Sequence, residues 1–586
     1  MDNTQIILLV VVIFVALVAA KMVYDGIARK KKIDRQIRRE FGSLPDNDYT
    51  APRYDKDGIA WYYKNKEKTT PVIDDITWND LDMDTVYMIL NNTSTGIGEE
   101  YLYAMLRMPC MDDGLLKERD RIAQYFDSHE KERFSVMREL KKLGKLRMSS
   151  VGQYLSSIRS MRPHNPTFHV VCCLLMILCI VGCIVDVNRF LMPLLLMFAV
   201  NISTYFSYKG KITSYFVVFS YLARMTQTAA NVANLNCDGI ARYNEELKTC
   251  VKPLKNISRF AWLFVSGTDF SADLIALVLD YLKIITHIDL IIFDRMVYNI
   301  YTYRNELDRI IDIMGEIDSD LAIASYRRYM GGQVCTPELR SEGPLSIKTE
   351  NIYHPMIINP VKNTLDEARS VLLTGSNASG KSTFLKTIAI NAIFAQTIYT
   401  CLADSYESPF FRVYSSMALQ DNIQGNESYY IVEIKSLKRI VDAAGGALTA
   451  SADAGDHAAL DPDTAYAHVP VLCFIDEVLR GTNTVERIAA SSRILHALAH
   501  KNALCFAATH DIELTTILEE TYANYHFQEE VDDHDVKFDY LLYQGRATSR
   551  NAIKLLGIIG FNEEIIEEAT AAARDFEDSG TWPAMK

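Results

Sequence analysis

Nine residues in the middle of the chain have types and spacing suited to holding a polyphosphate. The run Gly375-Ser-Asn-Ala-Ser-Gly-Lys-Ser-Thr383 matches GxxxxGK[ST], a loop whose glycines let backbone N–H groups face phosphates. In this pattern the lysine, Lys381, adds a mobile positive charge, and the hydroxyl of Ser382 ligates magnesium. The remaining loop positions are Ser376, Asn377, Ala378, Ser379 and Gly380. An apolar strand precedes the loop and a helical pattern follows it, so the sequence predicts a site for ATP and Mg²⁺.

Two adjacent carboxylates end a second apolar run, at residues 469–475. We expect Asp476 to hold the magnesium through water and Glu477 to polarise the water that attacks the γ-phosphate. Paired acids at a strand end are also common as solvated turn residues. The phosphate loop elsewhere in the chain favours the catalytic interpretation.

A third apolar run, residues 503–508, leads to Thr509 and His510. The carboxyl ends of parallel strands meet at one edge of a sheet, so the three sets of residues should converge. His510 would then contact the γ-phosphate or the attacking water. A lone histidine after a strand is more often structural, and its position relative to the other two motifs carries this prediction.

The elements around these residues alternate between strand and helix patterns from about residue 345, which is typical of a parallel α/β sheet. We therefore expect an α/β P-loop domain over residues 341–586. Within it, residues 443–468 are rich in alanine, glycine and aspartate and predict a flexible insertion. A metal role for His457 and its neighbouring aspartates is the weaker alternative.

The amino-terminal segment is apolar and uncharged from Gln5 to Ala20 and is followed by basic residues. It is long enough to cross a bilayer, and residues 1–24 are predicted to be a transmembrane anchor, with a basic juxtamembrane linker over 25–77. A cleaved signal peptide would carry its positive charge before the apolar run. The basic residues after it place the amino terminus outside and the remainder in the cytoplasm.

Residues 168–208 contain two more apolar runs, 168–185 and 190–208, separated by a short turn. Because basic residues flank them on the same side, they predict a transmembrane hairpin in a multi-pass protein, which we expect in a bacterial inner membrane. The alternative is a buried helical hairpin in a soluble core, because each run is near the lower length limit and Pro193 interrupts the second.

Helical periodicity dominates on both sides of this hairpin, over residues 78–167 and 209–340. These segments predict an all-α lever or bundle split into two parts. The apolar stretch 261–293 contains recurring acidic residues and predicts an amphipathic helix for packing or dimerisation. The expected fold is thus multi-domain: transmembrane helices, an all-α lever domain and a carboxy-terminal α/β P-loop ATPase domain.

Composition narrows the class of protein. A chain of 586 residues is too long for a single core, and a net charge of −13 argues against a broadly basic surface for nonspecific nucleic-acid binding. Its mean hydropathy is near zero, which is high for a purely soluble protein. The 11 cysteines lack CxxC spacing, so neither a disulfide framework nor a zinc site is indicated.

The chain resembles the MutS family of ABC-type ATPases. The resemblance rests on the phosphate loop with Asn377, on Ile475-Asp-Glu-Val-Leu-Arg-Gly-Thr-Asn483, on Ala508-Thr-His-Asp-Ile-Glu-Leu-Thr515, and on Asp421-Asn-Ile-Gln-Gly-Asn-Glu-Ser428. In all, the resemblance covers roughly residues 80–160 and 300–575. The resemblance implies that Ser428 begins a helix that reaches the ATP of a neighbouring subunit, and hence a homodimer with Glu477, His510 and Ser428 in catalysis.

Departures from the family leave the function open. An apolar helix and a basic linker stand where the family's mismatch-reading domain would be, and Asn426 and Glu427 replace glycines before Ser428. One hypothesis is a membrane-anchored ATPase that binds some DNA structure. The alternative is an ATP-driven regulator of a membrane or protein partner with no DNA binding and no mismatch repair role. A nonhydrolytic ATP-gated scaffold remains only if Glu477 is not a base.

Overall fold

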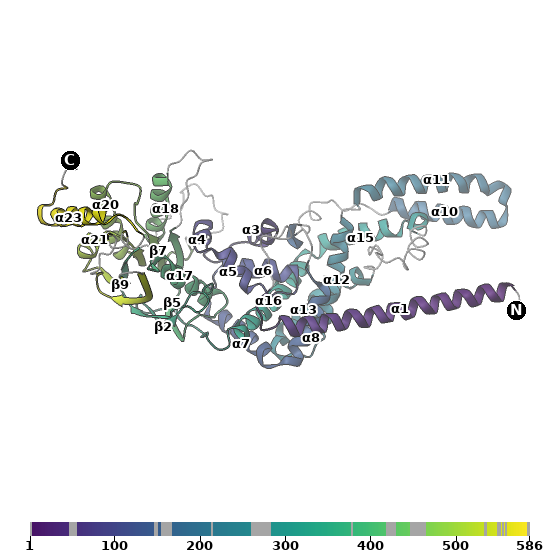
Figure 1. Ribbon diagram of the computed structural model, residues 1–586. Coiled ribbons are helices and arrows are strands. Elements are labelled where there is room, and N and C mark those ends of the chain that lie inside the picture. The colour runs from purple at the N-terminus through teal and green to yellow at the C-terminus, as the bar shows by residue number, and fades with distance from the viewer. Residues whose placement is uncertain are drawn as a thin grey trace. The chain divides into compact units, whose positions relative to one another are not determined.

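A computed structural model describes residues 3–45, 55–145, 150–153, 167–212, 215–259, 283–376, 379–417, 429–445, 465–531, 536–547, 553, 556 and 560–582 (Figure 1). The chain divides into two compact units. Unit 1 comprises Met1–Lys66, Ile89–Ala104 and Arg121–Tyr329. Unit 2 comprises Glu67–Met88, Met105–Asp120 and Met330–Lys586.

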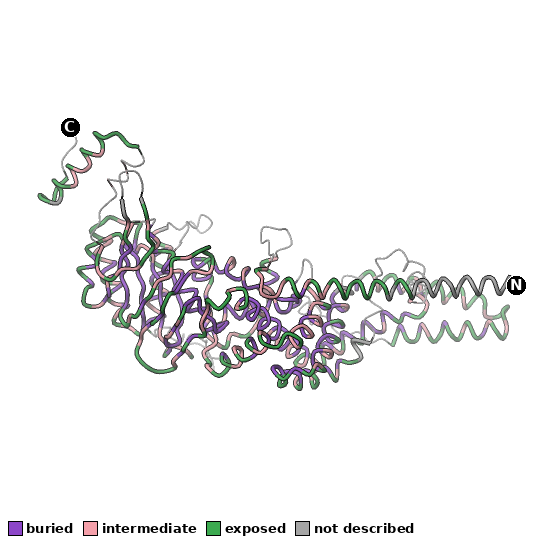
Figure 2. The backbone as a smooth tube through the Cα atoms, turned by 60° about the horizontal axis from the view of Figure 1, so that its bottom comes forward, coloured by how far each residue is buried: buried purple, intermediate pink, exposed green. Residues whose placement is uncertain are grey.

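Among its described residues, the regular elements of unit 1 are helices, which confirms the mainly helical prediction for this part. Those that lie wholly within it are α1 (Asn3–Glu40), α2 (Lys56–Ile59), α3 (Trp61–Asn65), α8 (Glu130–Leu143), α10 (Thr167–Val185), α11 (Val187–Ile212), α12 (Phe216–Ala233), η2 (Asp238–Ile240), α13 (Ala241–Arg259), α15 (Ile288–Thr302) and α16 (Arg304–Tyr329). The division of the chain falls within α5 (Met83–Leu90), α6 (Gly96–Arg107) and α7 (Asp113–Ser128). Helix α12 packs against α8, α13 and α16, and its side chains Phe219, Leu222 and Met225 are buried. Figure 2 shows the buried stretches of the backbone in purple.

A buried carboxylate fixes the start of α6 in unit 1. Asp318 of α16 accepts hydrogen bonds from the backbone N–H groups of Ser94 and Thr95, at 2.9 and 2.8 Å, and from the Thr95 hydroxyl at 2.7 Å. Ser94 and Thr95 directly precede the first residue of α6, and the Thr95 hydroxyl in turn accepts from the Gly98 N–H at 2.9 Å, a donor that the first turn leaves without an intrahelical partner. The carboxylate of Asp318 therefore stabilises the start of α6 within unit 1.

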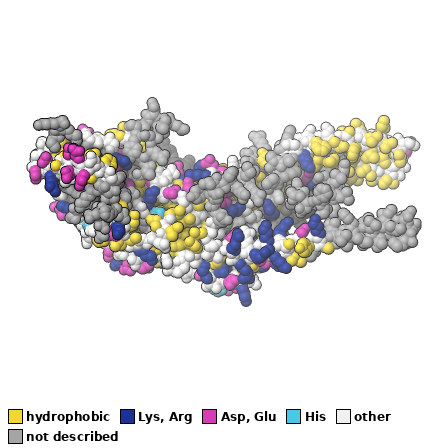
Figure 3. Space-filling view, viewed as in Figure 1, with side chains coloured by type: hydrophobic (Ala, Val, Ile, Leu, Met, Phe, Trp, Pro, Cys, Tyr) yellow, Lys and Arg dark blue, Asp and Glu magenta, His cyan; other side chains and the backbone are white. Residues whose placement is uncertain are grey.

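The helices α10 and α11 form the predicted apolar hairpin. Both are long and apolar enough to cross a membrane, with mean hydropathies of 2.9 and 1.6, and only 17% and 11% of these windows are buried. The central helix of a soluble core would be mostly buried, so this exposure disfavours the alternative of a buried hairpin. Pro193 was predicted to interrupt the second run, but it lies inside α11, which continues past it. Figure 3 shows apolar side chains gathered along this hairpin.

Polar contacts join the base of the hairpin to α15. The Nδ1 atoms of His169 and His287 lie 3.1 Å apart, and the hydroxyl of Tyr205 donates to Asp289 at 2.8 Å. Helix α15 also packs on α12 through the rings of Phe219 and Phe293. The predicted amphipathic helix over 261–293 is described only from residue 283 onward, and its dimerisation role stays a prediction.

Unit 2 is built on two sheets, which confirms the mixed α/β prediction at the level of element types. The larger sheet has the order β10-β9-β4-β8-β7-β6 and the smaller has the order β1-β5-β2-β3. Strands β9, β4, β8, β7 and β6 are parallel, and β10 is an antiparallel edge strand. The strands are β1 (Glu338–Arg340), β2 (Ile347–Ile352), β3 (Asn363–Glu367), β4 (Ser370–Thr374), β5 (Ser405–Pro409), β6 (Arg412–Ser416), β7 (Val471–Asp476), β8 (Ala503–Ala508), β9 (Tyr522–Val531) and β10 (Val536–Gln544).

Helices cover both faces of the larger sheet. Alternate residues of a strand point to opposite faces, so Cys473 and Cys505 join the core under α18 (Tyr429–Ala444), α20 (Thr484–Ala499) and α21 (Ile512–Ile517). The stacked rings of Phe474 and Phe506 point the other way. Helix α17 (Lys381–Thr397) contacts β6, β7 and β8 and is buried along most of its length. The last helix is α23 (Glu563–Ser579).

Two earlier segments of the chain complete unit 2. Helix α4 (Asp75–Asp80) packs on β6, where Asp80 accepts hydrogen bonds from the Ser415 hydroxyl at 2.6 Å and the Met417 N–H at 2.9 Å. The N–H of Cys110 donates to the carbonyl of Gln396 at 2.7 Å. The edge strand β6 is therefore covered by residues far away in sequence.

Candidate functional site

The strand order brings the predicted chemical residues to one edge of the larger sheet. Strands β4, β8 and β7 are parallel neighbours, with Leu373 opposite Ala508 and Ala508 opposite Asp476. The phosphate loop follows β4, His510 follows β8, and the two acids lie at the end of β7. Three distant sequence motifs therefore meet within hydrogen-bonding distance.

The described part of the phosphate loop requires its glycines. Gly375 has a φ of +140°, and a Cβ atom there would come within 2.8 Å of the Ser379 hydroxyl and 3.0 Å of the Phe527 carbonyl oxygen. Gly380 has a φ of +102° and precedes the first residue of α17. Larger residues would be strained at both positions. Asn377 and Ala378 lie outside the described residues.

Lys381 lies at the mouth of this loop, where its ammonium donates to the carbonyl oxygens of Gly375 and Ser376, both at 2.8 Å. Burial lowers the pKa of Lys381, while the nearby acids Asp476, Glu477 and Glu529 oppose that shift. A buried ammonium group at the first residue of a helix is suited to binding an anion.

Ser382 and Asp476 form a pair of oxygen donors. The Ser382 hydroxyl donates to Asp476 Oδ2 at 2.5 Å. Burial raises the pKa of Asp476, Glu477 raises it further, and the Ser382 hydrogen bond opposes both. Hydroxyl and carboxylate oxygens are the ligands that Mg²⁺ prefers, and a divalent cation would stabilise this partly buried carboxylate in its ionised form. The two residues therefore fit the predicted magnesium site.

Glu477 is held between two nitrogen groups. Its Oε1 lies 3.2 Å from His510 Nε2, and its Oε2 lies 3.2 Å from Arg480 Nε. The backbone of Glu477 is left-handed, with φ of 56°, and its N–H donates to the Ala508 carbonyl at 3.0 Å. Strained backbone geometry of this kind clusters at functional sites and persists only where the surroundings enforce it.

His510 faces both charged residues through the same nitrogen. Lys381 Nζ lies 3.4 Å from His510 Nε2, the atom that also faces Glu477. A protonated Nε2 donates to Glu477, whereas an unprotonated Nε2 accepts from Lys381, so only one contact is a hydrogen bond at a time. Burial lowers the pKa of His510, and Lys381 lowers it further. The neutral ring is thus favoured.

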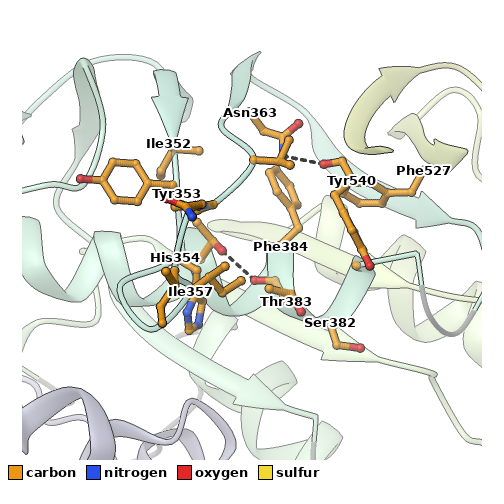
Figure 4. Close-up of a pocket in the computed structure, with 16 residues that line it drawn as sticks. Ile352, Tyr353, His354, Ile357, Asn363, Ser382, Thr383, Phe384, Phe527 and Tyr540 are labelled. Carbon is orange, nitrogen blue, oxygen red and sulfur yellow. Dashed lines mark hydrogen bonds between the residues drawn. The ribbon is translucent and has the colours of Figure 1, made fainter. Parts of the chain in front are cut away.

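A cavity of about 600 Å³ adjoins the phosphate loop (Figure 4). Tyr540 lies on one side, and Tyr353 and Ile357 lie on the other, with Ser382 and Thr383 at the base. Asn363 fixes the Tyr540 segment, because its amide donates to the Tyr540 carbonyl at 3.1 Å and accepts from the Leu542 N–H at 2.8 Å. The volume and the apolar, aromatic walls suit a planar organic ring.

Sequence reasoning missed this cavity. The sequence feature that could have indicated the cavity is the apolar pair Ile357 and Ile358, which lies in a loop between Pro355 and Pro360. This pattern is neither helical nor strand-like. Both isoleucines are exposed beside the cavity. Tyr540 carries no motif, and its left-handed φ of 55° arises from the irregular pairing of β10 with β9.

Two further interactions brace the loops after the strand ends. The buried carboxylate of Glu433 in α18 accepts from the Arg480 N–H at 3.2 Å. Arg487 in α20 donates to both oxygens of Asp511, at 2.9 and 2.6 Å. Of the predicted catalytic residues, Glu477 and His510 come together. Ser428 lies outside the described residues.

The chain is similar in part to known proteins. Residues 371–448 and 465–577 match the family model for MutS domain V. The DNA mismatch repair protein MutS of Natronomonas pharaonis is 28% identical over 264 residues, which is 43% of this chain and 28% of that protein. The DNA mismatch repair protein MSH6 of Saccharomyces cerevisiae is 26% identical over 303 residues, which is 46% of this chain and 22% of that protein. The chain thus matches about a quarter of the length of these relatives.

Proposed function

Because the chain belongs to the MutS family through the domain that carries this site, we propose that it binds and hydrolyses ATP there. The single observation that supports this most strongly is the convergence of Lys381, at the start of α17, with Asp476 and Glu477 at the end of β7. The cavity beside the phosphate loop takes the adenine ring, which stacks on Tyr540, and the triphosphate follows the loop towards Lys381.

The side chains divide the work of hydrolysis. Lys381 and the loop N–H groups bind the phosphates, and Glu477 accepts a proton from the attacking water. His510 positions Glu477 through the contact at 3.2 Å. Ser382 and Asp476 would hold Mg²⁺, which neutralises charge on the phosphates when it is bound.

A purified full chain in detergent tests this function. We expect Glu477→Gln to slow ATP hydrolysis by about 10² to 10⁴-fold while it leaves nucleotide affinity nearly unchanged. Glu486→Gln is the matched control, because Glu486 is an exposed acid at the start of α20. Equal hydrolysis rates in the Glu477 variant and the wild type would rule out the assignment of the base.

The proposed active form is a homodimer in which Ser428 of each subunit reaches the ATP of the other. The family resemblance supports this, and so does α23, since Phe561, Ile565 and Phe576 near and on this helix present exposed apolar side chains that a second copy could cover. With ATP present, the Glu477→Gln protein should dimerise in mass photometry. A protein that stays monomeric would contradict the shared site.

We place the first half of α1 and the helices α10 and α11 in a membrane, with unit 2 and the remainder of unit 1 on the cytoplasmic side. Support comes from the exposure and hydropathy of α10 and α11, and from the apolar sequence of the first half of α1. Alkaline carbonate extraction of membranes should leave the full chain in the pellet. Release of the chain into the supernatant would contradict a membrane location. ATP-driven closure of the dimer would then move the helices of unit 1.

Two functions fit this movement, and they differ in the molecule that the moving helices act on. The relatives are named as DNA mismatch repair proteins, which supports binding of a DNA structure. The exposed apolar hairpin instead favours regulation of a membrane or protein partner. DNA affinity measured at two salt concentrations separates them, because phosphate contacts release counterions and weaken steeply as salt rises. Stimulation of ATP hydrolysis by one DNA form would establish the first function.

A further inference from the structure

The second half of α1 carries a dense positive charge. Over residues 29–39 there are seven basic side chains and a single acidic one, Asp34. All seven are exposed: Arg29, Lys30, Lys31, Lys32, Arg35, Arg38 and Arg39. Figure 3 shows Lys and Arg side chains gathered on the face of unit 1 that carries α1 and α8.

Among the residues of α1 whose burial the structure describes, contact with the body of unit 1 begins beyond residue 32. Ile37 is buried there, Asp34 pairs with Arg138 at 2.8 Å, and Glu40 pairs with Lys141 at 2.5 Å. The acidic residues of this segment are thus neutralised by α8. Residues 24–32 are exposed on every side of the helix, so the charge of residues 29–32 faces solvent all round.

The position of this charge along the helix is fixed by helix geometry. With a rise of about 1.5 Å per residue, residues 29–32 lie roughly 12–17 Å beyond Lys21, where the apolar sequence ends. A headgroup layer is about 5–8 Å thick, and charges interact through salt over about 8 Å. Helical side chains also lean towards the amino terminus, which here is the side of the apolar segment.

We propose that residues 29–32 of α1 bind the headgroups of anionic phospholipids at the membrane surface. This rests on the membrane placement proposed above. A cluster of four or more Lys and Arg directly after a membrane segment attracts acidic lipids by about 1 kcal/mol per residue, which is roughly fivefold in affinity. Arg35, Arg38 and Arg39 lie farther from the lipid, and Arg38 already contacts Glu130 at 3.6 Å.

Lipid fits this surface better than DNA does. The basic residues continue a helix whose preceding sequence is apolar, and they surround the helix instead of forming one stripe that could follow a groove. The chain as a whole carries a net charge of −13, which opposes a long polyanion more than it opposes single headgroups at one end of a helix.

Lysine footprinting of the full chain in nanodiscs tests the proposal. The chain is placed in phosphatidylcholine discs or in discs with 30% phosphatidylglycerol, and amine acetylation is followed by mass spectrometry. We expect the acidic lipid to slow labelling of Lys30, Lys31 and Lys32 by at least about threefold, and 0.5 M salt to reverse this. Lys248 and Lys252, which are exposed on α13, are the internal controls and should not respond.

A triple variant, Lys30→Gln with Lys31→Gln and Lys32→Gln, provides a second readout. Native mass spectrometry should show at least about fivefold less enrichment of phosphatidylglycerol on this variant than on Lys248→Gln with Lys252→Gln and Lys255→Gln. Failure of the full chain to enter nanodiscs would count against the membrane placement itself. Entry without protection or enrichment would overturn this inference alone. Protection of the same lysines by duplex DNA but not by acidic lipid would also overturn it, in favour of a nucleic-acid site.

Discussion

Unit 2 and unit 1 both bury charged side chains, but they use them differently. In unit 2, Asp476 ends β7, Glu477 follows it and Lys381 begins α17. His510 lies beside both Lys381 and Glu477, and Ser382 joins Asp476 to the wall of a cavity. In unit 1, the carboxylate of Asp318 accepts hydrogen bonds from backbone N–H groups at the start of α6. Burial of charge therefore does not mark a site by itself. Convergence on a space that a ligand can enter does.

The largest effect should come from the core of unit 1. Phe219 is fully buried against Phe293, with ring centroids 4.9 Å apart, and Phe219→Ala should destabilise unit 1 by about 3–5 kcal/mol. Hydrogen exchange should speed up in α12 and α15, while nucleotide affinity stays unchanged. Tyr301→Ala, at an exposed position of α15, is the control. Loss of nucleotide binding in the Phe219 variant would mean that the two units are not energetically separate.

The next effect lies in unit 2, where Lys381→Met removes the ammonium and keeps an apolar stem of similar length. Two charge-assisted hydrogen bonds to phosphate are lost, so ATP affinity should fall at least about 100-fold. Thermal stability without nucleotide should not fall, because burial already disfavours the charged lysine, as its lowered pKa shows. Calorimetric titration measures the affinity, and Lys348→Met on the exposed surface of β2 is the control. Wild-type affinity in the Lys381 variant would contradict the site.

The site was more predictable than the helical unit because its chemistry follows local rules. A glycine-rich loop, a lysine and acids at strand ends can be recognised from short segments, and parallel strand order brings them together. The cavity could not be predicted, since Tyr540 and Ile357 come from separate loops whose paths depend on β-pairing irregularities and on Asn363. The packing of α4 on β6 could not be predicted either, because Asp80 and Ser415, which join them, are far apart in sequence.

Apolar length predicted the helices α10 and α11, but it could not place what joins them to the rest of unit 1. The contacts of His169 with His287 and of Tyr205 with Asp289 pair residues about a hundred positions apart. Nothing in the local pattern of these residues distinguishes them from solvated ones. Their partners are set by tertiary packing alone.

A second buried acid of unit 1, Glu100, lets the cost of burying a charge outside the site be measured through its pH dependence. Glu100 accepts from the Val151 N–H at 2.7 Å, and burial raises its pKa from 4.5 to about 8. Between these two values the native state keeps a proton that the unfolded state releases, so stability falls as the pH rises through this window. Glu100→Gln should have little effect at pH 5 and stabilise unit 1 by at least ~2 kcal/mol at pH 9. Chemical denaturation followed at both pH values measures this, and a stabilisation that is equal at pH 5 and pH 9 would contradict the raised pKa.

The smallest effect should sharpen the distinction between groups that do chemistry and groups that place them. Asp511 directly follows His510 and is held on both oxygens by Arg487, whose helix begins just after the loop that follows Glu477. We expect Asp511→Asn and Arg487→Gln each to slow hydrolysis about tenfold, since each leaves a partly buried charge unpaired and lets His510 move away from Glu477.

Nucleotide affinity should stay within about twofold in both variants, because neither residue lines the cavity or the phosphate loop. The double variant should be no slower than either single one, since residues that act as a pair are not additive. Arg546→Gln, which breaks the exposed contact with Glu519 in the same unit, should change nothing. Additive losses in the double variant, or a large rise in KM for ATP, would show that Arg487 and Asp511 act separately instead of as one clamp on His510.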